Sequence, residues 1–213
     1  MHERLTDLRS TKNPKVRIKI LKGHFATSNS HISTFIDMST VKTRHNNCRE
    51  TAKELAREYM YTTPVDTIVC LEETVAIGTF MAERLADMDQ HSLSKGNNIS
   101  IVSPEYHQNG QILFRDNVQR MIRDSRVLIL APSITTGKSV KRAIEAVLYY
   151  GGIVCGICSV FSSIQKINGL EVKTVFTQKD IPGYRAYAPS ECPMCKDGQK
   201  LEAIVNSYGY SKL

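Results

Sequence analysis

The sequence predicts an α/β protein built on a parallel-centred sheet flanked by helices, and three observations carry this prediction. Residues 127–130 form a wholly apolar run, which is typical of a central parallel strand buried on both faces. From residue 140 to 148 the apolar positions keep the three-to-four spacing of one helix face, until Gly151 and Gly152 stop the helix. The same succession of strand, loop and helix occurs earlier, over residues 65–88. Strands that alternate with helices favour a parallel sheet with right-handed crossovers.

At the N-terminal end the sequence predicts a small antiparallel hairpin, which we call the hood and place at residues 15–40. Residues 16–21 alternate apolar and basic side chains. Residues 34–38 form a second extended run after the polar turn at 27–30. These two runs are the expected strands of the hood.

The remaining elements are predicted from the spacing of apolar residues, which is every second residue in a strand and every third or fourth residue in a helix. A helix is predicted from Asn47 to Pro64. It is followed by a strand at 65–71, a loop at Glu72-Glu73-Thr74 and a helix at 75–88. The central strand is expected to end at Pro132, which cannot donate a ladder hydrogen bond. Two further strands are predicted at 153–161 and 172–176, followed by a turn-rich tail at 181–213 with a short helix near 201–205.

Composition and charge narrow the class of protein. The 213 residues are 41% hydrophobic and 23% charged, which predicts one globular domain. No apolar run approaches the length of a membrane span and no secretory signal is evident, so we expect a cytoplasmic protein. The final tripeptide, residues 211–213, spells a peroxisomal address, which is a weak signal by itself. The formal net charge of +7 comes mainly from residues 1–60, and without a nucleic-acid-binding motif it favours small anionic ligands.

The loop at residues 133–139 links the central strand to the following helix. It offers hydroxyl groups, a bare glycine backbone and the free N–H groups of a helix N-terminus, where the helix dipole favours an anion such as phosphate. A nucleoside triphosphatase loop would need glycine at position 132, where this chain has Pro132. An ordinary crossover, in which Thr135 and Thr136 merely cap the helix, stays open as an alternative.

The motif I-T-T-G-x-S in this loop resembles the phosphoribosyl-pyrophosphate loop of the type I phosphoribosyltransferases. The resemblance covers most of residues 16–180 and implies a single domain over 1–213 that includes the hood and the tail. It assigns the 5′-phosphate to Thr135, Thr136, Gly137, Lys138 and Ser139. The chain departs from the family at Ala131 and Pro132, where the family has two carboxylates that grip the ribose hydroxyls.

Within that family the segment from His24 to Asp37 is similar to the base-binding hood of orotate phosphoribosyltransferases. The resemblance implies that Phe35 and Ile36 face the base, while the alternative is that they are core residues of a small sheet. The family's pyrophosphate loop falls on Glu72, Glu73 and Thr74. The two carboxylates would repel pyrophosphate there unless they turn away or hold a metal.

The family's mobile catalytic loop corresponds to residues 101–116, and it normally supplies lysine, arginine and histidine to the pyrophosphate. This chain has no lysine from Gly96 to Gly137, so His107 and Arg115 are the only stand-ins. A lone histidine on a loop is commonly just solvated. The catalytic residues are otherwise unassigned.

The resemblance implies transfer of a 5-phosphoribosyl group between phosphoribosyl pyrophosphate and a pyrimidine-type base, with Mg²⁺ as cofactor if the protein is active. It also implies a homodimer, because the mobile loop of the family completes the neighbouring subunit's site. The missing ribose carboxylates predict weak or altered transfer. The alternative function is a non-catalytic regulatory protein of the same fold that binds a phosphorylated ribose or a nucleotide.

The six cysteines are expected to be reduced thiols, and they include two C-x-x-C pairs. Cys155 and Cys158 lie in a predicted strand, where residues three apart point to opposite faces, so they are poorly placed to chelate. Cys192 and Cys195 are weak zinc candidates, because the proline and glycine around them favour the tight turn of a zinc knuckle. A tetrahedral site needs two further ligands, which the neighbouring sequence does not supply, so no metal is assigned.

Overall fold

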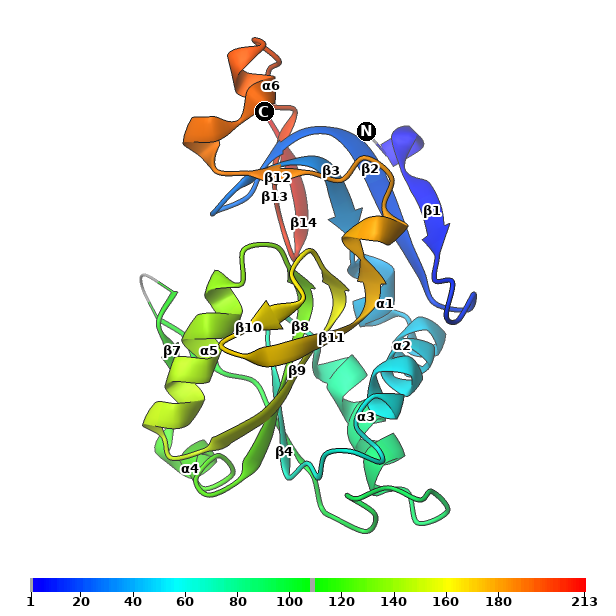
Figure 1. Ribbon diagram of the computed structural model, residues 1–213, viewed down its shortest axis with the longest axis vertical. Helices are drawn as coiled ribbons and strands as arrows, with labels where there is room; N and C mark the ends of the chain where they lie inside the picture. The colour runs from blue at the N-terminus through cyan, green and yellow to red at the C-terminus, as the bar shows by residue number, and fades with distance from the viewer. Residues whose placement is uncertain (1, 108–109) are drawn as a thin grey trace.

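The computed structural model describes residues 2–107 and 110–213, and its described strands form two six-stranded sheets and one short hairpin. The two large sheets lie one above the other in Figure 1. The lower sheet has the strand order β10-β11-β9-β8-β4-β5 and is parallel except for the β10–β11 pair. Its strands are β4 (Thr67–Cys70), β5 (Ser100–Val102), β8 (Arg126–Ile134), β9 (Ile153–Ser162), β10 (Lys166–Ile167) and β11 (Leu170–Thr177).

Helices cover both faces of this lower sheet. Leu128 and Leu130 of β8 pack in one hydrophobic cluster with α2 (His45–Arg57) and α3 (Val75–Ala86). Val127 and Ile129 point the other way, into a second cluster with α5 (Lys138–Tyr149). The apolar run at 127–130 is therefore buried on both faces, as the sequence predicted. The prediction of a parallel-centred sheet flanked by helices is confirmed.

The central strand β8 does not end at Pro132, which corrects one expectation. Pairing on the β4 side stops where the Leu71 N–H donates to the Leu130 carbonyl at 2.8 Å. On the β9 side, Ser133 and Ile134 continue in register with Phe161 and Ser162. Because β4 has already ended, the missing N–H of Pro132 breaks no ladder on that side.

The upper sheet is the hood, with the order β12-β3-β2-β13-β14 and β1 paired to β2. The predicted hairpin is present, as β2 and β3, but both ends of the chain extend it. The strands are β1 (Thr6–Arg9), β2 (Arg17–Ala26), β3 (His31–Asp37), β12 (Ala186–Tyr187), β13 (Ala203–Asn206) and β14 (Gly209–Lys212).

The prediction of a short helix near 201–205 is wrong, because residues 203–206 form strand β13. Ala203 and Val205 are buried while Ile204 and Asn206 are exposed, which is the two-residue period of a strand. A second correction concerns β9, where a register shift opposite Val127 and Leu128 breaks the alternation of faces. As a result Cys155 and Cys158 both pack against the same hydrophobic cluster.

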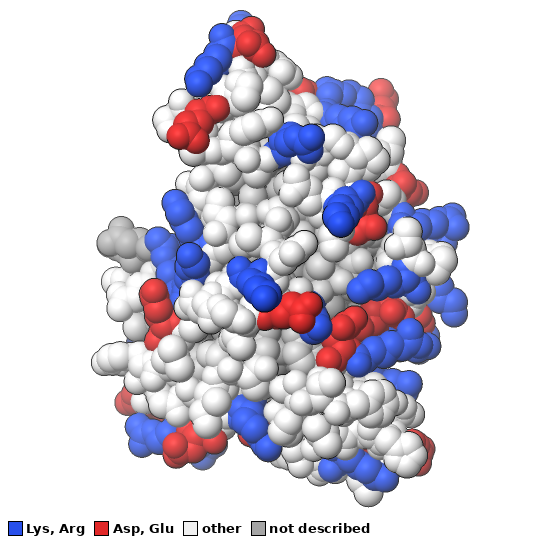
Figure 2. Space-filling model, viewed as in Figure 1, with Lys and Arg blue, Asp and Glu red and all other residues white. Residues whose placement is uncertain are grey.

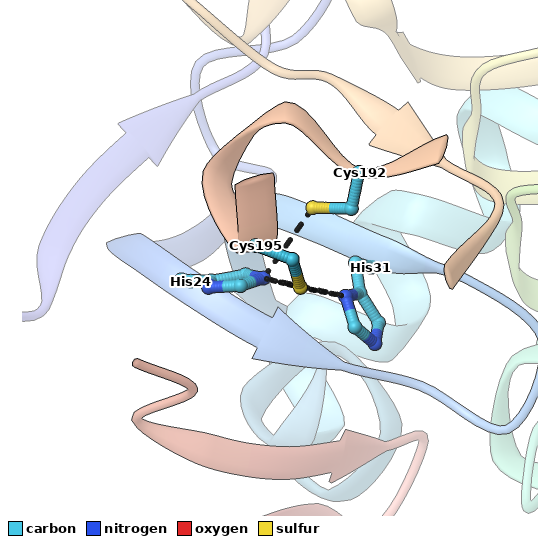
Figure 3. Close-up of side chains that lie close together, drawn as sticks. All are labelled: His24, His31, Cys192 and Cys195. Carbon is cyan, nitrogen blue, oxygen red and sulfur yellow. Dashed lines mark hydrogen bonds between the residues drawn. The ribbon is translucent and has the colours of Figure 1, made fainter. Parts of the chain in front are cut away.

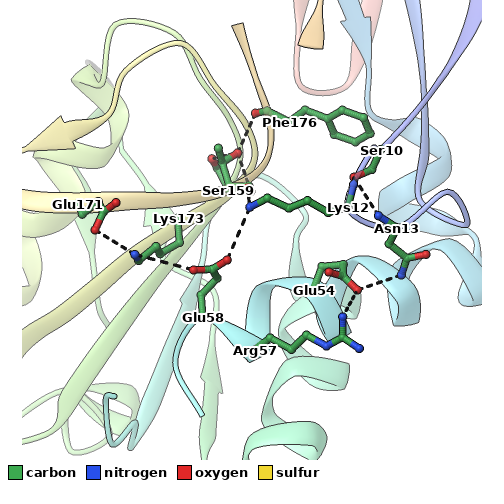
Figure 4. A network of polar contacts seen from close by, with 11 residues as sticks. Ser10, Lys12, Asn13, Glu54, Arg57, Glu58, Ser159, Glu171, Lys173 and Phe176 are labelled. Carbon is green, nitrogen blue, oxygen red and sulfur yellow. Dashed lines mark hydrogen bonds and ion pairs between the residues drawn. The ribbon is translucent and has the colours of Figure 1, made fainter. Parts of the chain in front are cut away.

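The remaining elements are short. They are α1 (Ser39–Thr43), α4 (Asp116–Gln119), α6 (Pro193–Lys196), the hairpin β6 (Glu105–Tyr106) and β7 (Ile112–Leu113), and 3-10 turns at His2–Arg4, Gln178–Asp180 and Pro189–Glu191. The segment before β2 is joined to α2 and β11 by the polar network in Figure 4. In it the Lys12 ammonium lies 3.6 Å from a Glu58 carboxylate oxygen and donates to the Thr174 carbonyl at 3.4 Å.

Charged side chains are mixed on the face shown in Figure 2. Basic side chains gather along the edge next to the N-terminal segment and α2, and acidic ones lie among them. This face therefore carries no uninterrupted basic strip of the kind that follows a nucleic-acid backbone. Among the described residues, every helix is too short or too polar to cross a bilayer.

Candidate functional site

A cavity of about 480 Å³ lies between the hood and the carboxyl ends of the parallel strands, the edge at which α/β sheets bind ligands. Four runs of residues and several single residues, far apart in the sequence, line it. They are the hood residues Thr27–Ser30 and Thr34–Ile36, the loop Ser133–Ser139, single side chains from Glu72, Tyr106, Arg142 and Tyr184, and the C-terminal residues Val205–Tyr208.

The predicted phosphate loop occupies one wall of this cavity, and all five residues assigned to the 5′-phosphate line it. Gly137 is the N-cap of α5 and has a left-handed backbone with φ of 75°. The Ser163 hydroxyl holds the loop by donating to the Thr135 carbonyl at 2.8 Å. The first N–H groups of α5, which have no partner within the helix, therefore face the cavity edge where an anion is favoured.

The alternative interpretation, in which threonines cap the helix, does not hold. The N-cap position belongs to Gly137 and no side chain makes a capping hydrogen bond. The Thr135 hydroxyl instead lies 3.5 Å from the Tyr184 hydroxyl across the cavity wall. Thr136 is exposed, so its hydroxyl is available to a ligand.

The loop after β4 carries two left-handed residues in succession, Glu72 with φ of 49° and Glu73 with φ of 65°. Such a conformation is uncommon for residues other than glycine and is enriched at functional sites. Glu73 turns away from the cavity toward Lys42, whose ammonium lies 3.1 Å from its carboxylate. Thr74 is buried and its hydroxyl donates to the Leu71 carbonyl at 2.8 Å, so it supports the turn from inside.

Glu72 lines the cavity, and burial raises the pKa of its carboxyl group. A hydrogen bond with Ser207 and the charge of Lys42 oppose that shift. The Lys42 ammonium is itself buried and donates to the Ser207 carbonyl at 2.6 Å. The loop after β4 is thereby connected to the tip of the β13–β14 hairpin.

The two predicted base-binding residues both line the cavity. Phe35 is only 3% exposed and packs edge-on against Phe25 and Tyr210, with ring centroids 6.3 and 5.8 Å away. Ile36 is half-buried. Phe35 thus serves the hood core and the cavity wall together, whereas Ile36 has more free surface.

His107 and Arg115, which were expected to replace the basic residues of the family's mobile loop, lie outside the cavity lining. His107 is exposed and its backbone N–H donates to the Gln111 carbonyl at 2.9 Å. Arg115 forms a two-pronged pair with Glu105, with nitrogen to oxygen distances of 2.5 and 2.6 Å. Residues 108–109 of this loop lie outside the described part of the chain.

Several cavity residues were not anticipated from the sequence. Arg142 lies one helical turn beyond Lys138 on α5, so the spacing of four residues could have identified it. Tyr184 and residues 206–208 come from the tail and had no local signal. Among the described residues of the lining, Glu72 is the single carboxylate. The protein thus offers one ligand to a Mg²⁺ ion, which is at the lower limit of what such sites use beside substrate phosphates.

Comparison with known proteins finds relatives of this chain by sequence and by structure. No protein-family model matches the chain. The orotate phosphoribosyltransferase of Chlorobium phaeobacteroides is 25% identical over 186 residues, which cover 86% of this chain and 88% of that enzyme.

Solved structures show the same fold. Leishmania donovani UMP synthase matches with a TM-score of 0.55 and 17% identity over 75% of this chain, which spans 34% of that longer protein. An adenine phosphoribosyltransferase from Thermoanaerobacter pseudethanolicus matches with a TM-score of 0.52 and 14% identity over 83% of this chain and 96% of that one. Because enzymes for different bases share the fold, fold alone leaves the base open. The chain therefore has the fold of solved phosphoribosyltransferases and is similar in sequence to orotate phosphoribosyltransferases.

Proposed function

We propose that the cavity binds a 5-phosphoribosyl ligand, with its phosphate on residues 135–139. One observation carries the proposal: the loop that matches the family motif forms the N-terminus of α5 and opens into the cavity with its hydroxyls free of capping bonds. Lys138 and Arg142 add positive charge on the same helix face. The ring of Phe35 and the side chain of Ile36 supply an apolar wall for the base at the hood side.

The activity that we propose is transfer of the phosphoribosyl group between phosphoribosyl pyrophosphate and a pyrimidine-type base. In such a transfer the base nitrogen attacks the anomeric carbon, pyrophosphate leaves, and the protein contributes positioning and charge stabilisation. No protein nucleophile is required. The cavity residues would hold the two reactants in line.

We expect this transfer to be weak. Ala131 and Pro132 are both buried in the C-terminal half of β8, and neither can accept a hydrogen bond from the ribose through its side chain. Charge-assisted hydrogen bonds contribute about 1.5–3 kcal/mol each, so each missing carboxylate lowers the rate by roughly one to two orders of magnitude. Glu72, when ionised, repels the leaving pyrophosphate. Magnesium, if used, would arrive with the diphosphate and find only Glu72 in the described lining.

Ala131 and Pro132 also favour a second candidate function, that of a non-catalytic protein that senses a phosphorylated ribose or a nucleotide. The phosphate half of the site is complete and the ribose half is not. Binding without turnover would distinguish this function from slow transfer.

The test is a calorimetric and thermal-shift screen of phosphoribosyl pyrophosphate, orotate, orotidylate and common mononucleotides, each with and without magnesium. We expect phosphorylated ribosyl compounds to bind and Thr136→Ala to weaken them about tenfold, the loss of roughly one hydrogen bond. Thr79→Ala is the matched control, because Thr79 is exposed on α3 away from the cavity. Equal binding by the two variants would count against the assigned phosphate site.

Turnover is measured on the same protein by following orotidylate formation. A rate near an ordinary enzyme value of roughly 1 per second would contradict the expectation of weak transfer. Other groups, such as Glu72, would then have to hold the ribose.

The proposal extends to a homodimer in the cytoplasm, as in the family pattern where a mobile loop completes the neighbouring site. Light scattering at micromolar concentration should give twice the chain mass. A monomer at that concentration would remove the dimer from the proposal.

A further inference from the structure

Four potential metal ligands from opposite ends of the chain converge where the β2–β3 hairpin of the hood meets the tail. His24 is on β2 and His31 is on β3, on either side of the turn that lines the cavity. Cys192 and Cys195 flank the start of α6 in the tail. Their ligand atoms all lie within 4.8 Å of one another. Figure 3 shows the two imidazoles and the two thiols directed toward one shared point.

Four of the six distances between the ligand atoms match the edges of a tetrahedron around zinc, and the other two are within 4.8 Å. Bonds of about 2.0–2.1 Å to nitrogen and 2.3 Å to sulfur place two nitrogens about 3.3 Å apart and a nitrogen and a sulfur about 3.6 Å apart. His24 Nε2 and His31 Nδ1 are separated by 3.3 Å. His24 Nε2 lies 3.5 Å from Cys192 Sγ and 3.6 Å from Cys195 Sγ, and His31 Nδ1 lies 3.2 Å from Cys195 Sγ.

Hydrogen bonding alone does not account for this cluster. His24 Nδ1 lies 2.8 Å from the Gln199 carbonyl, so it must carry the proton, and Nε2 keeps a single lone pair. Three other ligand atoms approach that lone pair within 3.6 Å, yet it can accept only one hydrogen bond. One cation at the shared point would satisfy all four groups together.

The surroundings also have the features of a metal knuckle. After Cys192 the backbone makes a tight turn, in which the Lys196 N–H donates to the Cys192 carbonyl at 3.2 Å and the Gly198 N–H to the Cys195 carbonyl at 3.0 Å. Gly198 has a left-handed φ of 73°. The Gln199 carbonyl fixes the tautomer of His24, as outer partners of metal-bound histidines do.

We propose that His24, His31, Cys192 and Cys195 bind one structural Zn²⁺ ion. Two thiolates and two imidazoles in a tetrahedral arrangement select zinc over magnesium or calcium, and four protein ligands leave no open position for catalysis. The ion fastens the tail to the hood hairpin. Because His24 and His31 flank the turn Thr27–Ser30, it also fixes one wall of the cavity.

The first test is the metal content of protein made in zinc-supplemented medium and purified without chelator. We expect about one zinc per chain, and a cobalt-substituted protein with the intense visible bands of tetrahedral thiolate coordination. Removal of zinc with a strong chelator should lower the melting temperature by about 10 °C. Zinc below roughly a tenth of the chain concentration without a cobalt spectrum, or an isolated protein with Cys192 and Cys195 joined in a disulfide, would overturn the assignment.

Variants locate the ion. Cys195→Ser and His31→Asn should each reduce bound zinc to roughly a tenth or less under dialysis against a weak chelator. The controls are Cys155→Ser, from the other C-x-x-C pair, and His107→Asn, from an exposed loop; both should keep the full content. Cys195→Ser protein with undiminished zinc would place the ion elsewhere. If a ligand variant does not fold, the cobalt spectrum of the unmodified protein still decides, since weak octahedral bands would refute the site.

Discussion

Replacing Lys42 with methionine tests whether one buried ammonium holds the tail against the loop after β4. The Lys42 side chain is 3% exposed, and its Nζ donates to the Ser207 carbonyl at 2.6 Å and lies 3.1 Å from the Glu73 carboxylate. It also lies 5.4 Å from the centre of the Tyr208 ring. Methionine has a similar length and no charge, so Lys42→Met removes these three interactions while it keeps most of the packing.

The three interactions contribute unequally. Glu73 is 56% exposed, so its ion pair with Lys42 contributes at most about 1 kcal/mol. The charged hydrogen bond to Ser207 contributes about 1.5–3 kcal/mol and the ring contact about 1 kcal/mol. Methionine has no ammonium group to desolvate on folding, and this gain offsets part of the stability that is lost with the three interactions. We expect a net loss of about 2 kcal/mol, or about 4–8 °C in melting temperature for a chain of this size.

The assay is urea and thermal unfolding of Lys42→Met, with Glu73→Gln as the control. Because the exposed pair contributes at most about 1 kcal/mol, Glu73→Gln should shift the melting temperature by no more than about 2–4 °C, less than Lys42→Met does. Lys42→Met should also weaken phosphoribosyl ligands, since Ser207 and Tyr208 line the cavity. Equal shifts in the two variants would refute the reasoning, because the exposed ion pair would then carry the stability.

Two further predictions concern pH. The pKa of Glu72 is raised by burial, so its ionisation lowers stability as pH rises from the unfolded value of about 4.3 to the folded pKa. Glu72→Gln should therefore melt higher than the unmodified protein at pH 8, lose that advantage below about pH 4, and bind phosphorylated ligands more tightly; a pH-independent difference would contradict this. The pKa of Asp66 is lowered by its hydrogen bonds from Arg126, so its stabilisation is present above about pH 4 and is lost as pH falls through the folded pKa. Asp66→Asn should destabilise by on the order of 1 kcal/mol at pH 7 and by less in acid, and urea unfolding at both pH values checks it.

The sequence predicted the central strand of the lower sheet and the loop and helix that follow it, because these elements depend on contiguous residues. The strand at 127–130, the loop and the helix after it form one uninterrupted unit, so local periodicity was sufficient. The end of the strand was misplaced at Pro132 because proline is disfavoured only where a neighbouring strand needs its N–H. That β4 ends first is a property of the sheet, which local sequence does not contain.

The tail was the part that local reasoning could not place. Residues 203–206 form a strand of only 4 residues, too short for its period of two to be distinguished from a helical turn. The sequence offers Cys192 and Cys195 only as weak zinc candidates, because His24 and His31 precede them by more than 160 residues. Only the pairing of β13 with β2 and of β12 with β3 brings the tail to these histidines.

A comparison of two glycines separates backbone strain from loop function in the phosphate site. Gly137 and Gly169 both have left-handed backbones, with φ of 75° and 83°. Alanine at either position pays about 1 kcal/mol or slightly more for that conformation. At Gly137 the new Cβ would also lie 2.9 Å from Ile164 Cδ1 and 3.2 Å from Ile167 Cδ1, whereas at Gly169 nothing lies within 4 Å.

We therefore expect Gly169→Ala to lose about 1 kcal/mol of stability and no ligand affinity. Gly137→Ala should lose a further 1–3 kcal/mol or so, because Ile164 and Ile167 are close-packed and the loop must shift to relieve the contact. That shift moves the first N–H groups of α5, so phosphoribosyl ligands should bind at least roughly tenfold more weakly. Unfolding and calorimetry on both variants measure the two effects separately. If Gly137→Ala loses stability but binds phosphorylated ligands as before, the phosphate does not sit on this loop, since no anion held by those N–H groups could be indifferent to their displacement.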